Sequence, residues 1–599
     1  MWDAALACVK VHARAIAVCG AWVTLRDAAS MRLFRSRFHA GVAVLTCAAA
    51  LLFWLPAFRE PFATGFGDWQ FFMHMWEAGY VAIVRYGEWP LWDPYHCGGI
   101  TIFGNPQSQH MSPLYALSLL AGPTLGSKLF IVIHAWAGFS GMFVLARRRG
   151  LSPPAAALAS LAFAASGFFA WHIGTGHAAF APFYFAPWVV LALRAAVDDV
   201  RYAVALAALM VLVLLEGGVY PFPYFLLLIA FESAAQLVSV RTPSRVMRAL
   251  LVSGVLIACI GAIRLWPILD ELQRSPRTMP SSDAVSLREL LEMLTARSHG
   301  WRWAGHEFVW SEYGCYVGWG VCALGALGGI VAATRRRTRW AVAGALLFLG
   351  LSFGEFGPLA PWSLLHQLPI YDSLRVPTRF VVLFTLYWAL LSGIGLDLIS
   401  SGWQRLCRGS RAWFAQLPAW MLVLALGTDL ALVQLPTVDK WRDPPVRIDQ
   451  RSARFYLTTL SYANYYASLP RMNLGSRECY EAMTFRPAHG LWVGDKPQAR
   501  LVSGRGVVGE FERTTSRASF DVTLQTPGRV VVNQNHAPGW TSSVGTVVAD
   551  RGRLAIDLPA GTHHVALVYR PTMLWRALAL SVFGLLLAYL LIRFGRSIA

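Results

Sequence analysis

Apolar runs recur along the chain from residue 39 to residue 593, and polar stretches rich in Gly and Pro separate them. Most runs are about 20 residues long, the length that a helix needs to cross the hydrocarbon core of a membrane. The pattern predicts twelve membrane-spanning helices, so the expected fold class is a polytopic α-helical membrane protein. The helices are expected at residues 39–57, 114–146, 153–172, 178–194, 202–219, 222–239, 248–268, 313–333, 340–353, 380–400, 417–434 and 573–593.

The composition agrees with this class. Of the 599 residues, 56% are hydrophobic and 14% are charged, whereas roughly a quarter of the residues in soluble domains are charged. The first 38 residues scatter charges through their apolar part, which does not fit a cleavable signal peptide. We expect residues 1–38 to form a cytoplasmic or interfacial lead-in.

The formal charge of +19 comes from basic clusters at every second junction between predicted spans. Short basic loops stay in the cytoplasm, so these loops and both ends of the chain are predicted to be cytoplasmic. The charge is then a signal of topology, with anionic lipid as its neighbour, and it gives no support to nucleic-acid binding. The clusters are "RRRG" from residue 147, "RTPSRVMR" from 241, "RRRTR" from 335, "RLCRGSR" from 405 and "RFGR" from 593.

This orientation places two long segments outside the membrane. The first is the loop at residues 58–113, within a membrane domain at 39–435. The second, residues 436–570, alternates polar and β-branched residues between turns, as in "RVVVNQNHAPGW". This pattern predicts a small β-rich, sandwich-like extracytoplasmic domain. Residues 571–599 are expected to hold the last transmembrane helix and a cytoplasmic tail.

Carboxylates gather on the same outer side. Asp68 is expected directly after the first span, among aromatic residues typical of a membrane interface. A lone aspartate there would simply face water, but many acids at outer helix ends and loops favour a functional site. They are Glu77, Glu88, Asp93, Glu216, Asp270, Glu271, Glu312, Glu355 and Asp372.

Other polar residues of the outer side suit a phosphorylated sugar. In the first loop, Asn105, Gln107, Gln109 and His110 offer donors and acceptors for hydroxyl groups. Arg375 and Arg379 in "RVPTR" could bind phosphate through their planar guanidinium groups, or they could extend to lipid headgroups. His172 and His177 in "WHIGTGH" could line the site, or they could be ordinary polar residues at a helix end.

These motifs resemble those of the GT-C glycosyltransferases, and more closely the bacterial YfhO-like branch of that superfamily. The resemblance covers nearly the whole chain after residue 40. It is carried by "GDWQ" at 67–70, "GEWPLWDPYHCGG" at 87–99, "GNPQSQHMSPLY" at 104–115, "LPIYDSLRVPTRF" at 368–380, "HAPGW" at 536–540 and "LPAGTHHVALVYRP" at 558–571. One departure is "EGGVYPFPY" at 216–224, where a Gly-His-Pro-Gln-like turn is expected.

The resemblance implies transfer of a sugar from a polyprenyl-phosphate donor to a glycan, lipid or protein acceptor. It implies a multi-pass protein of the bacterial cytoplasmic membrane, with membrane lipids as partners and the active site facing the periplasm. Asp68 would be the base or a metal-organising acid; a divalent metal ion is a candidate cofactor whose ligands the sequence does not identify. The expected substrate-binding residues are Gln70, Glu88, Asp93, Asn105, Gln107, His110, Glu216, Glu312, Arg375 and Arg379.

Elementary chemistry agrees with that assignment, because phosphate is a good leaving group and needs no second acid. Two alternatives stay open: a transporter or flippase of lipid-linked glycans, and a non-catalytic envelope scaffold. Against a transporter, the acids lie at helix ends and no inverted repeat is visible. Among the predicted outer cysteines, a Cys97–Cys315 disulfide and free buried thiols are both considered.

Overall fold

The computed structural model describes residues 37–65, 67–239, 243–280, 282–336, 338–406, 416–441, 443, 446, 451–460, 465–480 and 485–595. The predicted lead-in at residues 1–38 therefore lies almost entirely outside the described residues. Nine helices in the described part are long and apolar enough to cross a membrane. They are Ala40–Phe58, Pro123–Arg148, Pro153–Gly174, Ala178–Asp198, Pro221–Val238, Pro243–Ile260, Pro377–Trp403, Leu417–Val438 and Leu574–Phe594.

Shorter apolar helices at Val200–Leu215, Trp319–Thr334 and Arg339–Ser352 overlap the remaining three predicted spans. With 16 and 14 residues, the last two are only about 24 and 21 Å long, which is less than the roughly 30 Å of hydrocarbon. The polytopic helical class is confirmed by the nine longer helices, and the count of twelve spans stays a prediction.

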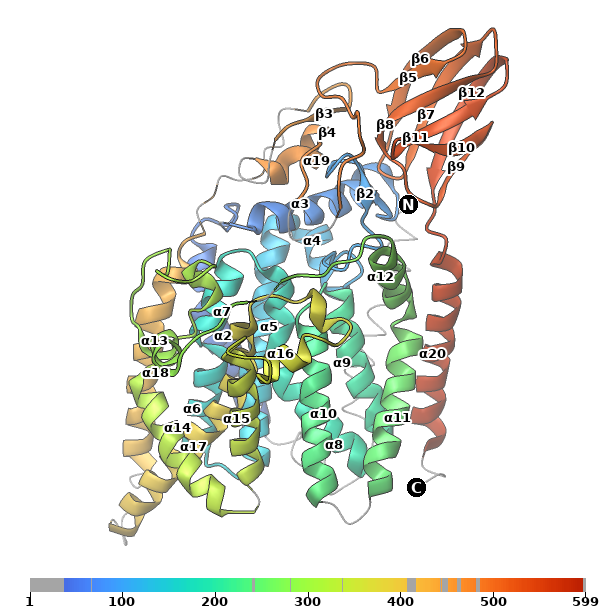
Figure 1. Ribbon diagram of the computed structural model, residues 1–599. Helices are drawn as coiled ribbons and strands as arrows, with labels where there is room; N and C mark the ends of the chain where they lie inside the picture. Colours follow the sequence, from blue (N-terminus) through green and yellow to red (C-terminus); the bar gives the residue numbers. More distant parts are fainter. Residues whose placement is uncertain are drawn as a thin grey trace.

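The helices stand side by side and form the lower part of the molecule (Figure 1). Their bounds in chain order are α2 Arg37–Trp54, α5 Pro123–Arg148, α6 Pro153–Ala164, α7 Gly167–Gly174, α8 Ala186–Asp198, α9 Ala203–Leu215, α10 Pro221–Ser239, α11 Pro243–Ile260, α12 Ala262–Arg274, α14 Trp319–Thr334, α15 Arg339–Ser352, α17 Val381–Leu406, α18 Leu417–Val438 and α20 Leu574–Phe594. Short helices at their outer ends are α3 Trp69–Tyr80, α4 Ala116–Ala121, α13 Leu287–Thr295 and α16 Pro361–Leu365.

Small residues bring α14 and α17 into close contact. A Cβ atom on Gly328 would lie 1.9 Å from the carbonyl oxygen of Leu391, and one on Gly395 would lie 2.1 Å from that of Leu324. Such close backbone approach through glycine is typical of helices that pack within a membrane. Any larger side chain at either position would therefore separate the two helices.

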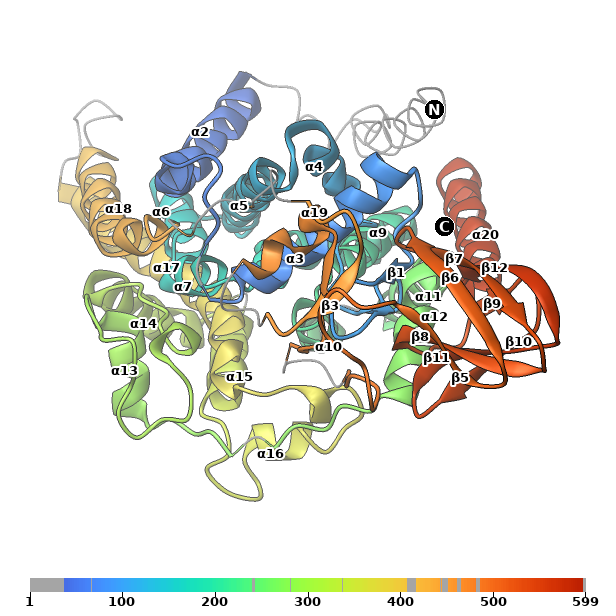
Figure 2. The ribbon, with the colours of Figure 1, turned by 90° about the horizontal axis from the view of Figure 1, so that it is seen from above.

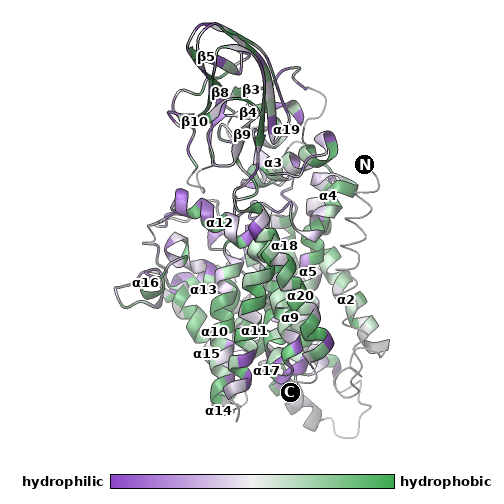
Figure 3. Cartoon of the chain, turned by 90° about the vertical axis from the view of Figure 1, so that its right-hand side faces the viewer, coloured by the Kyte–Doolittle hydropathy of each residue, from purple (hydrophilic) through white to green (hydrophobic). Residues whose placement is uncertain are grey.

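The distribution of hydropathy along the helices fits a membrane protein. Hydrophobic residues predominate along the upright helices, and hydrophilic ones gather around α12 and near the opposite ends (Figure 3). Helix α20 begins beside the β strands and ends at the far end of the helices (Figure 1). The β region and the C-terminal end of α20 are thus at opposite ends of the helices, as the charge pattern predicts. The orientation with respect to the bilayer stays a prediction.

The C-terminal β region consists of two four-stranded sheets, with strand orders β10-β11-β8-β5 and β6-β7-β12-β9. Neighbouring strands in each sheet are antiparallel, and side chains of both sheets share one hydrophobic core. The predicted β-rich region is confirmed. The strands are β5 Ala499–Ser503, β6 Gly506–Arg513, β7 Arg517–Leu524, β8 Gly528–Asn535, β9 Trp540–Ser542, β10 Thr546–Asp550, β11 Arg553–Leu558 and β12 Gly561–Tyr569.

Between α18 and the sheets, the chain crosses over the first outer loop (Figure 2). This crossing segment contains the parallel strands β3 Tyr456–Thr458 and β4 Leu474–Ser476, with α19 Leu469–Met472 between them. Arg471 of α19 forms an ion pair with Glu77 of α3. The loop itself adds the short strands β1 Trp92–Asp93 and β2 Ile100–Thr101, and Trp92 enters the core of the sheets beside Trp540.

Two sequence predictions need correction. Asp68 does not follow the first span directly, because the helical segment ends at Phe58 and Asp68 is the N-cap of α3, which lies across the outer helix ends (Figure 1). The Cys97–Cys315 disulfide is wrong, since Cys97 is bonded to Cys479. Cys315 is a buried free thiol whose sulfur lies 3.5 Å from the Thr385 hydroxyl on α17, so packing holds it away from Cys97.

Candidate active site

The candidate site forms where the turn before α3 meets the turn after α7. The backbone N–H of Asp68 donates to the carbonyl of Thr175 at 2.9 Å, and the Trp69 indole donates to that of Ile173 at 2.7 Å. A Cβ atom on Gly176 would lie 2.3 Å from the backbone nitrogen of Trp69, and Gly176 has a φ of +112°. Only glycine fits there. The motifs "GDWQ" and "WHIGTGH" thus form one structural unit.

Four side chains meet at this unit: Asp68, His172, His177 and Glu312, the last from the 3₁₀ turn Trp310–Glu312. Nε2 of His177 lies 3.3 Å from Oδ2 of Asp68 and 3.6 Å from Oε1 of Glu312. Nδ1 of His172 lies 3.7 Å from Oε2 of Glu312 and 3.0 Å from Nδ1 of His177. The Asp68 side chain is 26% exposed and that of Glu312 is 9% exposed, so Asp68 is the more accessible acid.

Arginines surround the same acids. Arg379, in the turn Pro377–Phe380, donates from Nε and Nη2 to Oε2 of Glu312 at 3.0 and 2.7 Å. Arg375 is partly exposed, and its guanidinium lies 5.5 Å from the centre of the Phe308 ring. No carboxylate among the described residues forms an ion pair with Arg375. Arg379 is therefore a neutralised, buried cation, whereas Arg375 is a partly exposed cation without a carboxylate partner in the described part of the chain.

These charges decide the protonation of the two acids. Burial acts to raise the pKa of Asp68, but the hydrogen bond and charge of His177, together with Tyr480 and Arg375, lower it overall. Burial likewise opposes ionisation of Glu312, yet Arg379 and the two histidines hold its pKa at about 2. Both carboxylates are thus ionised at neutral pH, and Asp68 can accept a proton.

His172, His177 and Glu312 also have the donor types of a metal site. One potential ligand atom from each residue can be chosen so that all lie within 4.8 Å of one another. Two imidazole nitrogens and a carboxylate oxygen are ligands that Zn²⁺ and related divalent ions accept. Since Arg379 occupies Oε2 of Glu312, Oε1 is the oxygen that fits a metal ion. The sequence offered both histidines as candidates without indicating that they meet Glu312.

The other acids predicted to bind substrate have protein partners of their own. Glu216 is fully buried, with Oε2 lying 2.7 Å from Nε2 of His134. Oδ2 of Asp93 lies 3.1 Å from Nε2 of His74. Glu88 accepts hydrogen bonds from the hydroxyls of Thr514 and Thr515 at 2.7 and 2.8 Å and from the N–H of Ser516 at 3.0 Å. Glu88 therefore attaches the first outer loop to the turn between β6 and β7.

The predicted amides and His110 lie within the first outer loop. Gln70 accepts from the Ala467 N–H at 3.2 Å, and Asn105 accepts from the Gln107 N–H at 2.9 Å. Oε1 of Gln107 and both ring nitrogens of His110 are buried without a hydrogen-bond partner, among the described residues. Burial lowers the pKa of His110 to about 3, so its ring is neutral. Of the residues predicted to bind substrate, the structure brings only Glu312, Arg375 and Arg379 to Asp68, and the roles of all ten stay predictions.

Comparisons with known proteins give only distant likenesses. No family model matches the sequence, and no curated protein matches it. The oligosaccharyltransferase of Archaeoglobus fulgidus is 15% identical over 68% of this chain, with a TM-score of 0.40. The arabinofuranosyltransferase AftD from mycobacteria is 17% identical over 65%, with a TM-score of 0.42. The likeness spans 56% of the first protein's length and 27% of the second's, and neither activity is carried over from it.

Proposed function

We propose that this protein is a membrane glycosyltransferase that moves a sugar from a polyprenyl-phosphate donor to an extracytoplasmic acceptor. One observation carries the proposal: the partly exposed Asp68 carboxylate lies 3.3 Å from His177, and the charge of Arg375 acts to lower the pKa of the same carboxylate. A carboxylate can accept the proton of an acceptor hydroxyl, and a guanidinium can bind the phosphate beside it.

The proposed reaction is a displacement at the anomeric carbon of the donor sugar. The acceptor hydroxyl transfers its proton to the Asp68 carboxylate, and its oxygen forms the new bond to the anomeric carbon. The bond from that carbon to the donor phosphate breaks, and its electron pair stays on the phosphate oxygen. Arg375 stabilises the negative charge that grows there. Because a prenyl tail lies in lipid, its phosphate would meet the protein at the membrane interface, where the predicted topology puts these side chains.

A divalent metal ion is part of the proposal. His172, His177 and Glu312 would hold it, and it would supply Lewis-acid stabilisation of phosphate charge. The chain's own groups would keep their tasks: Arg379 fixes Glu312, and the His177 ring links Glu312 to Asp68. We propose that the protein lies in the bacterial cytoplasmic membrane, with this site on the periplasmic side.

The function is tested with the full chain in lipid nanodiscs and a panel of polyprenyl-phosphate sugars. The expected result is consumption of at least one donor and appearance of the sugar on an added acceptor, both absent from empty nanodiscs. The same protein in sealed vesicles is tested for translocation of a fluorescent lipid-linked glycan. Translocation without any donor consumption would reject the transferase and favour the flippase.

Arg375→Lys is expected to weaken donor binding about 10-fold, measured as an increase in the donor KM. Lysine keeps the charge but loses the planar pair of donors that matches a phosphate. Because Arg375 has no ion-paired carboxylate among the described residues, the thermal stability of the variant should be that of the wild type. The matched control is Arg500→Lys on β5, remote from Asp68 in the sheets. An unchanged donor KM in Arg375→Lys would show that this arginine does not bind the donor.

A further inference from the structure

Tyr480 lies directly over Asp68, although the two residues are 412 positions apart. Its hydroxyl donates a hydrogen bond to Oδ2 of Asp68. Its ring stacks on that of Phe71 in α3, with 4.0 Å between ring centres and an angle of 16°. Tyr480 is only 5% exposed. Tyr480 is therefore a packed, buried residue of the site and not an exposed surface residue.

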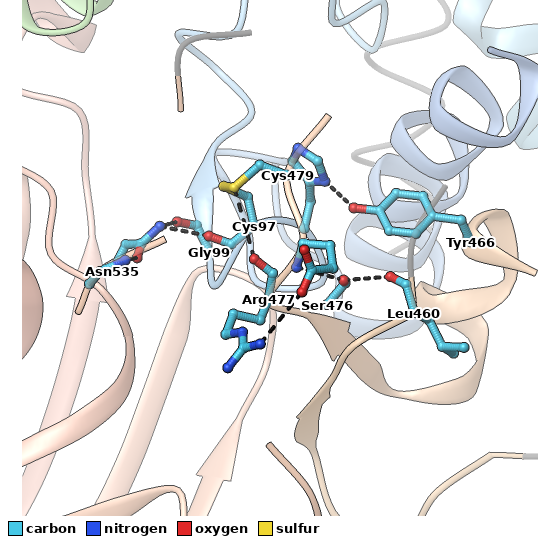
Figure 4. Close-up of a disulfide and its surroundings, with 11 residues drawn as sticks. Cys97, Gly99, Leu460, Tyr466, Ser476, Arg477, Cys479 and Asn535 are labelled. Atoms are coloured by element: carbon cyan, nitrogen blue, oxygen red, sulfur yellow. Dashed lines mark hydrogen bonds and ion pairs between the residues drawn. A yellow bond between two sulfur atoms is a disulfide. The ribbon is translucent and has the colours of Figure 1, made fainter. Parts of the chain in front are cut away.

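Cys479, the residue before Tyr480, is held by a covalent bond. Cys479 is joined by a disulfide to Cys97 at the tip of the first outer loop, with 4.4 Å between the Cα atoms (Figure 4). The backbone beside it pairs with the same tip: the Gly98 N–H donates to the Ser476 carbonyl at 2.8 Å, and the Ser476 N–H donates to that of Tyr95 at 2.9 Å. The crossing segment can move away from the loop only after these links are broken.

The sheets hold the loop tip from the other side. The side-chain amide of Asn535, at the end of β8, donates to the carbonyls of Cys97 and Gly99 at 2.8 and 2.9 Å (Figure 4). Its backbone N–H donates to the Gly98 carbonyl at 2.7 Å. The tip is thus clamped between the crossing segment and the β region, which makes it a rigid anchor for Cys479.

The consequence for Asp68 lies in which oxygen is engaged. Both the Tyr480 hydroxyl and Nε2 of His177 contact Oδ2. None of the described residues donates to Oδ1, which leaves that oxygen for a substrate. Two contacts on one oxygen fix the rotation of the carboxylate, and catalysis depends on such orientation because a misplaced base reacts slowly.

We propose that Tyr480 is a positioning residue for Asp68 and that the Cys97–Cys479 disulfide keeps it in place. The inference rests on the proposed function and adds a requirement to it: full activity needs this disulfide. The crossing segment then has a task that its sequence does not suggest, because it completes the site formed by the membrane helices.

The test compares four samples in nanodiscs: wild type and Tyr480→Phe, each before and after mild reduction that converts the disulfide to two thiols. Thiol labelling followed by mass measurement confirms the reduction. Tyr480→Phe keeps the stacked ring and loses only the hydroxyl. We expect kcat to fall about 10-fold, as for loss of one hydrogen bond to a charged group, with donor KM unchanged. Tyr456→Phe, in β3 of the same segment, is the matched control.

Reduction is expected to lower the kcat of the wild type by a similar factor and to change Tyr480→Phe less than twofold. Such non-additivity is what two groups acting as one unit produce, and a merely structural disulfide would slow both samples equally. Equal slowing would overturn the link between the disulfide and Tyr480. An active wild type with Tyr480→Phe within twofold of it would reject Tyr480 as a positioning residue. A wild type without transfer would instead reject the proposed function, and this inference with it.

Discussion

Asp68→Asn is expected to lower the turnover of sugar transfer by about 10²–10⁴-fold, which is the usual contribution of a general base. Asparagine has nearly the same shape, so the hydrogen bonds of the α3 turn to Thr175 and Ile173 should persist. The neutral amide oxygen of the asparagine cannot accept the proton of the acceptor hydroxyl. Initial rates with saturating donor and acceptor measure the effect, and thermal unfolding in the same nanodiscs shows whether the fold is kept.

Asp495→Asn is the matched control, because Asp495 is an exposed aspartate of the outer region with no contact to the site. Its turnover should equal that of the wild type. Turnover of Asp68→Asn within a few-fold of the wild type would mean that Asp68 is not the base. Glu312 is a poor substitute, since its buried carboxylate already binds Arg379; the base would then have to come from the substrate or from water.

The membrane helices were predictable because the signal is local. A run of apolar residues reports its own burial in lipid, whatever the rest of the chain does. The alternation in residues 499–569 was equally local, and the two sheets form where it predicted strands. What composition could not show is that residues 451–460 and 465–480 lie outside the two sheets and pack on the first outer loop.

The site was only partly predictable because its contacts join distant segments. Acids on one side of a membrane look alike in a sequence, yet Glu216 contacts His134, and Glu77 contacts Arg471, which lies 394 positions away. Such partners are visible only in three dimensions. The same holds for Tyr480, whose single sequence signal is the adjacent Cys479 on the outer side. The sequence alone had no geometric basis for pairing three outer cysteines: the Cys97–Cys315 alternative is wrong, and the free-thiol alternative holds for Cys315 but not for Cys97 and Cys479, which are bonded to each other.

Glu312→Gln is expected to lower the free energy of unfolding by about 3–5 kcal/mol, because it leaves Arg379 as an uncompensated buried charge. The Arg379 side chain is only 3% exposed, and Oε2 of Glu312 accepts both of its hydrogen bonds. Denaturant unfolding in one detergent measures the difference. Glu510→Gln is the matched control, because the Arg454–Glu510 pair has a similar distance, 3.3 Å, but both side chains are about 70% exposed. An exposed pair contributes little, so this variant should unfold like the wild type.

Replacing both partners separates the cost of an orphaned charge from the value of the pair. Glu312→Leu combined with Arg379→Met removes both charges, and apolar replacements of a buried ion pair are often neutral or stabilising. We expect the double variant to recover most of the stability that Glu312→Gln loses. Transfer activity should stay low in both, because the His177 ring that contacts Asp68 loses Glu312 as its second partner. If Glu312→Gln unfolds like the wild type, the Glu312–Arg379 pair does not stabilise the fold, and Arg379 would then join Arg375 as a candidate to bind the donor phosphate.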